Sequence, residues 1–394
     1  MAIGGLSDSI SGKRIRLGMV GGGEGAFIGA VHRLAARMDG HYELVAAALS
    51  ATADKARRSG AALGLAPERT YDDYESMAKA EAARPDGIEA VAIVTPNHVH
   101  AGPTYAFLAA GVHVICDKPL TLSLEEAKTM KAAVEKSGRI FALTHNYTGY
   151  PLVRRAREMV KSGELGKIQL VQVEYPQDWL TASPERDGNK QAEWRVDPAR
   201  AGAGGALGDI GTHAYNLADF IVGAEVAELA AELTSFGPGR ALDDNVQVML
   251  RYANGARGAL WASQVAPGNE NGLRIRVYGT KAGLTWVQAN PNEMFFGPLG
   301  EPVRILTRAG PGSGPADARV TRVPPGHPEG YLEGFANIYA EVALAIKAAR
   351  AGAPPPEGVM FPTIDDGVKG MAFIEAAVRS SKANGAWVKL REPL

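Results

Sequence analysis

The chain has 394 residues, enough for two domains, and its formal net charge of −1 argues against nucleic acid or an acidic membrane surface as the main partner. Its single cysteine, Cys116, excludes a disulfide framework and a cysteine metal cluster within one chain, and it favours a cytoplasmic protein. No apolar run is long enough to span a bilayer, and Met1–Gly12 lacks the apolar core of a signal peptide.

Strand-like and helical stretches alternate through the first 147 residues. The apolar patterns predict helices at 26–38, 72–84, 103–110 and 123–137, and strands at 15–20, 43–49, 90–95 and 140–143, with one more that starts at Val112 and ends before Lys118. Strands that alternate with helices form parallel βαβ units, so the pattern predicts a doubly wound parallel sheet.

A glycine-rich loop follows the first predicted strand. Gly21, Gly23 and Ala26 match the G-x-G-x-x-A form of the dinucleotide fingerprint, in which glycines allow a tight turn and a close approach of the backbone to a pyrophosphate. Glycine loops are common, but this one lies between a strand and a helix, whose N-terminal N–H groups bind phosphate. We therefore expect residues 1–147 to form an NAD(P)-binding Rossmann domain.

The form of the nicotinamide cofactor is left open by the second strand. An NAD-selective site usually has an acid at the end of this strand, whereas this chain has Ser50, followed by Lys55 and Arg57. A small hydroxyl and a nearby cation would tolerate the 2′-phosphate of NADP. Alternatively, Ser50 or Thr52 only caps the next helix, and Lys55 and Arg57 are solvated.

Polar residues cluster where the predicted strands end. These clusters are Thr95–His98, Lys118 and His145–Tyr147. Ligands bind beyond the carboxyl ends of parallel strands, so the clusters are expected to line one crevice; alternatively, Lys118 is a surface lysine at a strand end. His98 and His100 alternate along an extended segment and have no carboxylate or cysteine cluster beside them, so no metal site is expected.

The second half has a different pattern. Runs typical of strands lie at 168–175, 226–236, 245–252, 256–264, 273–278 and 284–288, a final short strand lies at 387–390, and closing helices are predicted at 331–350 and 364–384. Asn254-Gly255 predicts a tight hairpin. We expect residues 148–394 to form an α/β domain with a large, open, mostly antiparallel sheet, one face of which is free to pair with a second subunit.

Two features of this half suggest a ligand site. The long polar segment 176–208 carries Gln177-Asp178-Trp179 and Trp194-Arg195, whose aromatic and polar groups suit a polyhydroxylated ligand, although an interface or linker loop is an alternative. Asp209 and His213 are four residues apart on a predicted helix that ends at Val222, so they share a face. His213 could accept a hydroxyl proton, and Asp209 could orient it; alternatively, Asp209 caps the helix and His213 is a core residue.

Taken together, these motifs resemble the glucose-fructose oxidoreductase / inositol dehydrogenase (Gfo/Idh/MocA) family. The matching motifs are the glycine loop, Thr95-Pro96-Asn97-His98, Cys116-Asp117-Lys118-Pro119 and Gly208–His213. The resemblance implies a Rossmann domain, an α/β domain whose open sheet often makes oligomer contacts, and a lysine with an Asp-x-x-x-His pair acting on a sugar or cyclitol hydroxyl. These roles fall on Lys118, Asp209 and His213. Gln177–Trp179 and Trp194-Arg195 further resemble members that oxidise pyranoses or glycosides.

The resulting hypothesis is an oxidoreductase that transfers hydride between NAD or NADP and a secondary hydroxyl of a sugar, glycoside or cyclitol. Alternatives are a redox-neutral glycoside hydrolase or isomerase with tightly bound NAD, and a redox-silent regulator. We expect a sugar or polyol as the partner, no nucleic acid or membrane, and a homodimer or homotetramer. Expected cofactor contacts are Gly21, Gly23, Ala26, Phe27, Ser50, Lys55, Thr95, Pro96, Asn97, His98, Asp117 and Lys118. Expected substrate contacts are Asn97, Lys118, Tyr147, Asp178, Trp194, Arg195, Asp209 and His213.

Overall fold

The computed structural model describes residues 13–390; residues 1–12, where the sequence predicts no signal-peptide core, and 391–394 lie outside the described residues. The chain divides into two compact units. The first takes in the chain up to Thr121, Glu125–Gly149 and Tyr331–Val368; the second takes in Leu122–Leu124, Tyr150–Gly330 and the chain from Lys369 onward.

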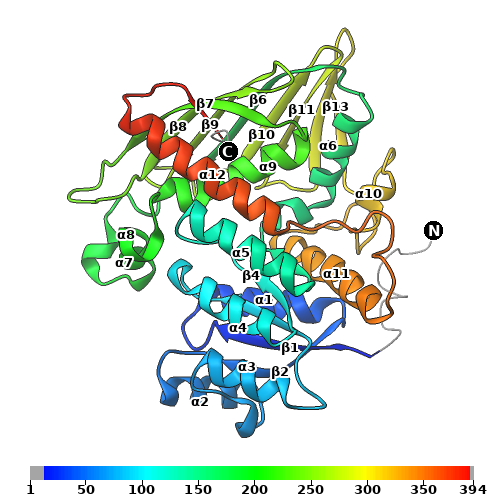
Figure 1. Cartoon of the computed structure of the whole chain (residues 1–394). Helices are drawn as coiled ribbons and strands as arrows, with labels where there is room; N and C mark the ends of the chain where they lie inside the picture. The colour runs from blue at the N-terminus through cyan, green and yellow to red at the C-terminus, as the bar shows by residue number, and fades with distance from the viewer. Residues whose placement is uncertain (1–12, 391–394) are drawn as a thin grey trace. The chain divides into compact units, whose positions relative to one another are not determined.

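The first unit is built on a five-stranded parallel sheet in the order β2-β1-β3-β4-β5. Strands β1, β2 and β4 are labelled in Figure 1. Its strands are β1 (Ile15–Gly21), β2 (Tyr42–Ala48), β3 (Ala90–Val94), β4 (His113–Cys116) and β5 (Phe141–Leu143). Its helices are α1 (Phe27–Met38), α2 (Ala53–Ala62), α3 (Tyr74–Ala82), α4 (Ala101–Ala109), α5 (Leu124–Ser137) and α11 (Tyr331–Arg350). The predicted doubly wound sheet is confirmed, and its strand order reverses between β1 and β3, the point where such sheets bind ligands.

Helix α11 completes the core of the first unit, although it comes from the far end of the chain. It packs against α1, where the ring nitrogen Nδ1 of His32 lies 2.8 Å from the Tyr339 hydroxyl, and the Tyr42 hydroxyl donates to the Tyr339 carbonyl (2.9 Å). Phe335, Ile338 and Tyr339 belong to the same apolar cluster as β1 and β3. The expectation that α11 closes the second-half sheet is therefore wrong.

The second unit is built on a nine-stranded sheet in the order β13-β12-β11-β10-β6-β9-β8-β7-β14. Its strands are β6 (Ile168–Pro176), β7 (Val226–Thr234), β8 (Asn245–Tyr252), β9 (Arg257–Ser263), β10 (Arg274–Gly279), β11 (Ala282–Val287), β12 (Glu293–Pro298), β13 (Arg304–Thr307) and β14 (Val388–Lys389). Its helices are α6 (Pro151–Lys161), α7 (Lys190–Arg195), α8 (Pro198–Ala201), α9 (Thr212–Val222) and α10 (Pro315–Ala318), and α12 (Ile364–Lys382) begins in the first unit and continues here.

This sheet is mostly antiparallel, as expected, with β6 and β9 paired in parallel. The predicted Asn254-Gly255 hairpin is present, and Gly255 has the positive φ (+91°) that the turn requires. Strands β12 and β13 were not expected. Helices α6 and α9 pack on one face of the sheet.

The other face, which we call the open face, exposes apolar side chains. One row of directly opposite residues crosses seven neighbouring strands, β8, β9, β6, β10, β11, β12 and β13. The row includes Met249, Gln172, Arg276, Phe295 and Ile305. Directly opposite residues share a face, so these side chains project together. Met249, Phe295 and Ile305 are 55%, 45% and 54% exposed, so the open face has a solvent-accessible apolar surface.

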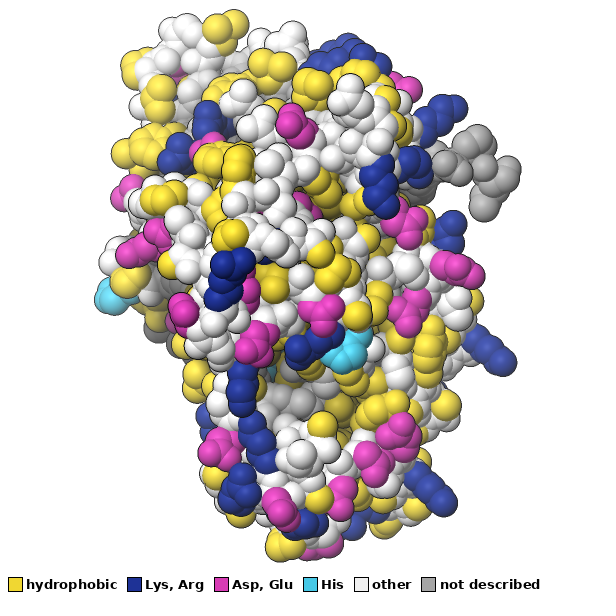
Figure 2. Space-filling view, turned by 90° about the vertical axis from the view of Figure 1, so that its left-hand side faces the viewer, with side chains coloured by type: hydrophobic (Ala, Val, Ile, Leu, Met, Phe, Trp, Pro, Cys, Tyr) yellow, Lys and Arg dark blue, Asp and Glu magenta, His cyan; other side chains and the backbone are white. Residues whose placement is uncertain are grey.

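Charge is mixed over the face of the molecule that Figure 2 shows. Acidic and basic side chains are interspersed there. None of the helices in residues 13–390 is long and apolar enough to cross a membrane.

Candidate active site

The glycine loop after β1 is packed too tightly for larger residues. A Cβ at Gly23 would lie 2.7 Å from the Leu49 carbonyl oxygen, and a Cβ at Gly29 would lie 2.4 Å from the Gly22 Cα. Gly21 and Gly22 both have positive φ, which favours glycine. The residue that lets α1 approach the loop is thus Gly29, in the first turn of the helix.

The N-terminus of α1 fits an anionic group. Ala26, the residue before the helix, supplies no side-chain cap, and the first turn contains no acidic residue. By contrast, α3 has Asp73 as a cap, which accepts a hydrogen bond from the Ser76 N–H. Uncapped N–H groups and the helix dipole favour a phosphate, so the loop and α1 fit the pyrophosphate of a dinucleotide.

The end of β2 lies beside this loop. The Gly23 N–H donates to the Leu49 carbonyl (3.2 Å), and the Glu24 N–H donates to the buried Ser59 hydroxyl (3.0 Å). Ser59, on α2, was not recognised from the sequence, where it looks like an ordinary helix residue. The Ser50 hydroxyl accepts from the Thr52 N–H (3.3 Å), so it occupies the turn between β2 and α2.

Two of the predicted strand-end clusters in the first unit are joined by hydrogen bonds. Asp117 Oδ1 accepts from the Lys118 N–H (2.8 Å) and from the Thr144 hydroxyl (2.9 Å), which links the ends of β4 and β5. Burial, reinforced by the charge of Lys118, lowers the pKa of His145 to about 3, so this imidazole is neutral. Lys118 therefore lies among a carboxylate, a hydroxyl and a neutral imidazole at the carboxyl edge of the sheet.

The two histidines that follow β3, His98 and His100, lie in different surroundings. Asn97 is buried, and His98 is exposed. His100 is buried, with Nδ1 2.8 Å from the Pro119 carbonyl oxygen and Nε2 3.0 Å from the Thr95 carbonyl oxygen. Its ring nitrogens are used to tie the ends of β3 and β4 together. Among residues 13–390, no group of three or more His, Cys, Asp or Glu could hold a metal ion.

In the second unit, Asp209 lies in a π-helical turn, Leu207–Gly211, that leads directly into α9. The sequence predicted the helix as far as Val222 but not this turn, which often marks a functional site. Asp209 Oδ2 accepts hydrogen bonds from Arg195 Nε (3.0 Å) and from Gln264 Nε2 (2.9 Å). His213 follows on α9, with its ring 6.4 Å from that of Tyr175.

A chain of amide side chains continues from this carboxylate, because Gln264 Nε2 also donates to Gln177 Oε1 (3.5 Å). Gln177 Oε1 accepts from Trp179 Nε1 (3.1 Å), and Gln177 Nε2 donates to Asn271 Oδ1 (2.8 Å). Asn271 Oδ1 also accepts from the Tyr175 hydroxyl (2.7 Å). We call Tyr175, Gln177, Arg195, Asp209, Gln264 and Asn271 the amide network; donors and acceptors alternate through it, as recognition of several hydroxyl groups requires.

Arg195 brings aromatic faces to this network. Its guanidinium carbon lies 4.3 Å from the Trp194 ring centroid and 5.7 Å from the Trp179 ring centroid. Trp194, Arg195 and Asp209, proposed from the sequence, thus come together. Asp178, next to Trp179 in the chain, accepts a hydrogen bond from the Gly268 N–H through Oδ2 (3.2 Å). Gln264 and Asn271 were missed because only strand pairing brings them here.

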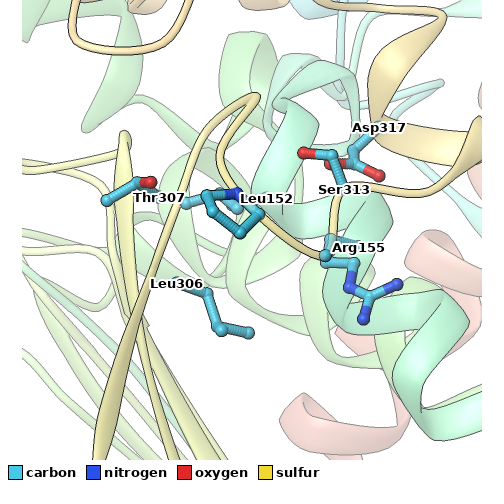
Figure 3. A pocket seen from close by; sticks show the side chains of 8 residues that line it. Leu152, Arg155, Leu306, Thr307, Ser313 and Asp317 are labelled. Carbon is cyan, nitrogen blue, oxygen red and sulfur yellow. The ribbon is translucent and has the colours of Figure 1, made fainter.

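A separate pocket lies between α6 and the chain that follows β13 (Figure 3). Leu152, Arg155, Leu306, Thr307, Ser313 and Asp317 contribute to its lining. It has room for no more than about one water molecule, and it contains no member of the amide network. It is too small for a sugar or a nucleotide.

Comparison with known proteins gives two family matches. Residues 15–145 match the model described as "Oxidoreductase family, NAD-binding Rossmann fold", and residues 153–285 match the GFO/IDH/MocA C-terminal domain. The matches cover both the glycine loop and the amide network.

Similar proteins extend over nearly the whole chain. An oxidoreductase structure from Sinorhizobium meliloti is 58% identical, with a TM-score of 0.87, over 96% of this chain and 100% of that one. An inositol dehydrogenase homolog from Azotobacter vinelandii, complexed with NADH and myo-inositol, is 37% identical, with a TM-score of 0.91, over 97% and 98%. The levoglucosan dehydrogenase of Pseudarthrobacter phenanthrenivorans is 30% identical over 95% of this chain and 98% of its own.

Proposed function

We propose that this chain, which belongs to the Gfo/Idh/MocA family of oxidoreductases, uses NAD to oxidise a secondary hydroxyl of a sugar, glycoside or cyclitol, or catalyses the reverse reduction. The observation that carries the proposal is the amide network around Asp209, which supplies paired donors and acceptors beside the rings of Trp179 and Trp194. Similarity to a protein complexed with NADH and myo-inositol and to a levoglucosan dehydrogenase supports this class of substrate.

In the proposed mechanism, bound NAD supplies the acceptor for the hydride that leaves the carbinol carbon. His213 takes the proton of the hydroxyl group. Lys118 binds the same oxygen and stabilises the negative charge that develops there. Asp209 orients His213 or holds a neighbouring hydroxyl, and Asn97, Tyr147, Asp178, Trp194 and Arg195 contact the substrate.

The cofactor proposal assigns the pyrophosphate to the loop from Gly21 to Phe27 and to the start of α1. Ser50 and Lys55 lie beside the adenosine ribose, and the strand-end residues Thr95, Pro96, Asn97, His98, Asp117 and Lys118 contact the nicotinamide half. The tight packing of Gly23 and the uncapped N-terminus of α1 support this assignment. Whether the chain also uses NADP is tested by measuring turnover with both nucleotides.

The test is turnover of a panel of pyranoses, glycosides and inositols with NAD and with NADP, followed by the absorbance of the reduced nicotinamide. Lys118→Ala and His213→Ala are each expected to lower kcat about 100-fold or more, since each removes a group that acts in the transition state. Lys136→Ala and His327→Ala change exposed residues and serve as matched controls. Unchanged turnover in both site variants would remove the mechanism, and product formation without added cofactor would point to a redox-neutral cycle.

We also propose that the open face forms the contact of a homodimer or homotetramer. Exposed apolar side chains on one continuous row, including Met249 and Phe295, support this assignment. Phe295→Glu is expected to lower the mass measured by light scattering, whereas Leu63→Glu, at another exposed apolar position, is not. A monomeric wild-type chain would refute the proposal.

Two further assignments complete the proposal. Residues 1–147 carry nucleotide binding, and residues 148–394 carry substrate binding and oligomer contacts. A cytoplasmic location is supported by the single cysteine, Cys116, which is buried.

A further inference from the structure

Asp243 is a buried aspartate that the proposed mechanism does not use. It lies in the connection between β7 and β8, and its carboxylate binds Gly205, just before the π-helical turn, and Leu207, the first residue of that turn. Oδ1 accepts from the Gly205 N–H and Oδ2 accepts from the Leu207 N–H, both at 2.8 Å. The Ala206 N–H donates to the Asp243 carbonyl oxygen (2.9 Å). Three consecutive backbone N–H groups therefore end on this one residue.

These three groups are donors that the start of a helix leaves without intrahelical partners. The Asp209 N–H donates to the Gly205 carbonyl (2.9 Å), so the turn that Asp243 holds is the turn that carries Asp209. The fit is close: a Cβ at Gly205 would lie 2.1 Å from the Asp243 carbonyl oxygen. Asp243 thus caps, from a distant segment, the element that leads into α9.

The same connection also reaches the Asp209 side chain. The Gln264 N–H donates to the carbonyl oxygen of Asp244 (2.8 Å), and Gln264 Nε2 donates to Asp209 Oδ2 (2.9 Å). Residues 243–244 therefore hold both the backbone turn that carries Asp209 and, through Gln264, the Asp209 carboxylate. Asp244 is itself fixed by Arg240 Nη1 (2.9 Å), which is buried.

We infer that Asp243 is a positioning residue for the reaction: its carboxylate fixes the π-helical turn so that Asp209 and His213 keep their placement toward the substrate hydroxyl. This inference rests on the proposed function, because Asp209 and His213 are the residues assigned to the substrate there. A neutral amide at position 243 turns one acceptor into a donor that faces a backbone N–H, which displaces the turn.

The test compares Asp243→Asn with Asp317→Asn. Asp317 is a second buried carboxylate of the same unit, and it accepts from the Gly314 N–H (2.7 Å), away from the π-helical turn. Asp243→Asn is expected to lower kcat about 10- to 100-fold while the KM for NAD changes by less than about twofold; Asp317→Asn is expected to leave kcat within about twofold. Gly205→Ala keeps the carboxylate but displaces the same turn, so it is expected to reproduce the Asp243→Asn result.

A second measurement does not depend on turnover. The ring-proton resonances of His213 are titrated by NMR in the folded wild type and variants, with assignment from His213→Gln. The titration is expected to shift in Asp243→Asn and Gly205→Ala and to stay unchanged in Asp317→Asn. A wild type that oxidises none of the panel contradicts the proposed function alone, since the titration still tests the inference. Asp243→Asn matching Asp317→Asn in the titration overturns the inference.

Discussion

At the scale of single residues, Ser50 is the position at which the end of β2 departs from an NAD-selective site. Its hydroxyl accepts from the Thr52 N–H, and the nearby Arg57 is held by Asp54 (2.8 Å) and Asp72 (3.3 Å). Ser50→Asp would place a carboxylate where it can accept from a ribose 2′-OH and repel a 2′-phosphate. We expect kcat/KM with NADP to fall at least about tenfold and kcat/KM with NAD to be maintained.

Ser50→Ala is the control, because it removes the hydroxyl without adding charge. Steady-state kinetics with both nucleotides make the comparison. Equal losses with NAD and NADP after Ser50→Asp would mean that position 50 does not face the ribose.

Candidate residues that are close in sequence could be proposed for this site from the sequence, whereas residues that meet only through the sheet could not. Asp209 and His213 share one element, and a resemblance of motifs was enough to select them. Gln264 and Asn271 are amides in a strand-rich region, and only the pairing of β6 with β9 and β10 brings them to Gln177 and Asp209. No local pattern marks such residues.

At the scale of elements, the contact between the glycine loop and α1 sets the geometry of the nucleotide site. A Cβ at Gly29 would lie 2.4 Å from both the Cα and the carbonyl oxygen of Gly22, which are backbone atoms that cannot rotate away. Gly29→Ala must therefore move α1 from the loop. We expect NAD affinity, measured by calorimetry, to fall at least about tenfold.

The control is Gly370→Ala, which makes the same change in α12, where an added Cβ meets nothing within 4 Å. It is expected to keep NAD affinity and to stabilise the fold by about 0.5–1 kcal/mol. If Gly29→Ala binds NAD with wild-type affinity, the nucleotide site tolerates the displacement of α1, and the prediction is wrong.

Element type and order were largely predictable, whereas element partners were not. The apolar pattern of α11 specifies a helix with a buried face but does not specify which sheet the face covers. The π-helical turn could not be predicted from the sequence either, because a single turn of five residues, Leu207–Gly211, is too short to show a period of its own. β12 and β13 flank a turn at Gly300 and contain exposed apolar residues, which obscure the alternation typical of a strand.

At the scale of the whole molecule, the first unit is expected to lose more stability in acid than the second. Burial lowers the pKa of His32 to about 4, of His113 to about 4 and of His145 to about 3, all in the first unit. The unfolded chain binds protons on these histidines below its pKa of about 6.5, and the folded chain does not. The free energy of unfolding of the first unit therefore falls as pH drops from about 6.5 toward 4.

In the second unit, Asp243 contributes to the pH dependence of stability with the opposite sign. Burial raises its pKa from 3.8 to about 6, so the folded state binds the extra proton between these values, and its contribution to stability falls as pH rises through this range. All five tryptophans lie in the second unit, so their fluorescence reports its unfolding, whereas circular dichroism reports both units. Urea unfolding at pH 5 is expected to show the dichroism midpoint below the fluorescence midpoint, with a smaller separation at pH 7.5. Two midpoints that shift equally would contradict the prediction.

The position of α11 also has a consequence during protein synthesis. The ribosome produces β1 to β5 first, but the side of α1 that Phe335 and Tyr339 cover stays bare until Tyr331–Arg350 has left the exit tunnel. A nascent chain of 1–147 therefore carries an uncovered apolar patch, and expressed alone it should bind chaperones or aggregate. When the Tyr331–Val368 segment is joined to this fragment through a short linker, the fragment is expected to stay in solution without aggregation.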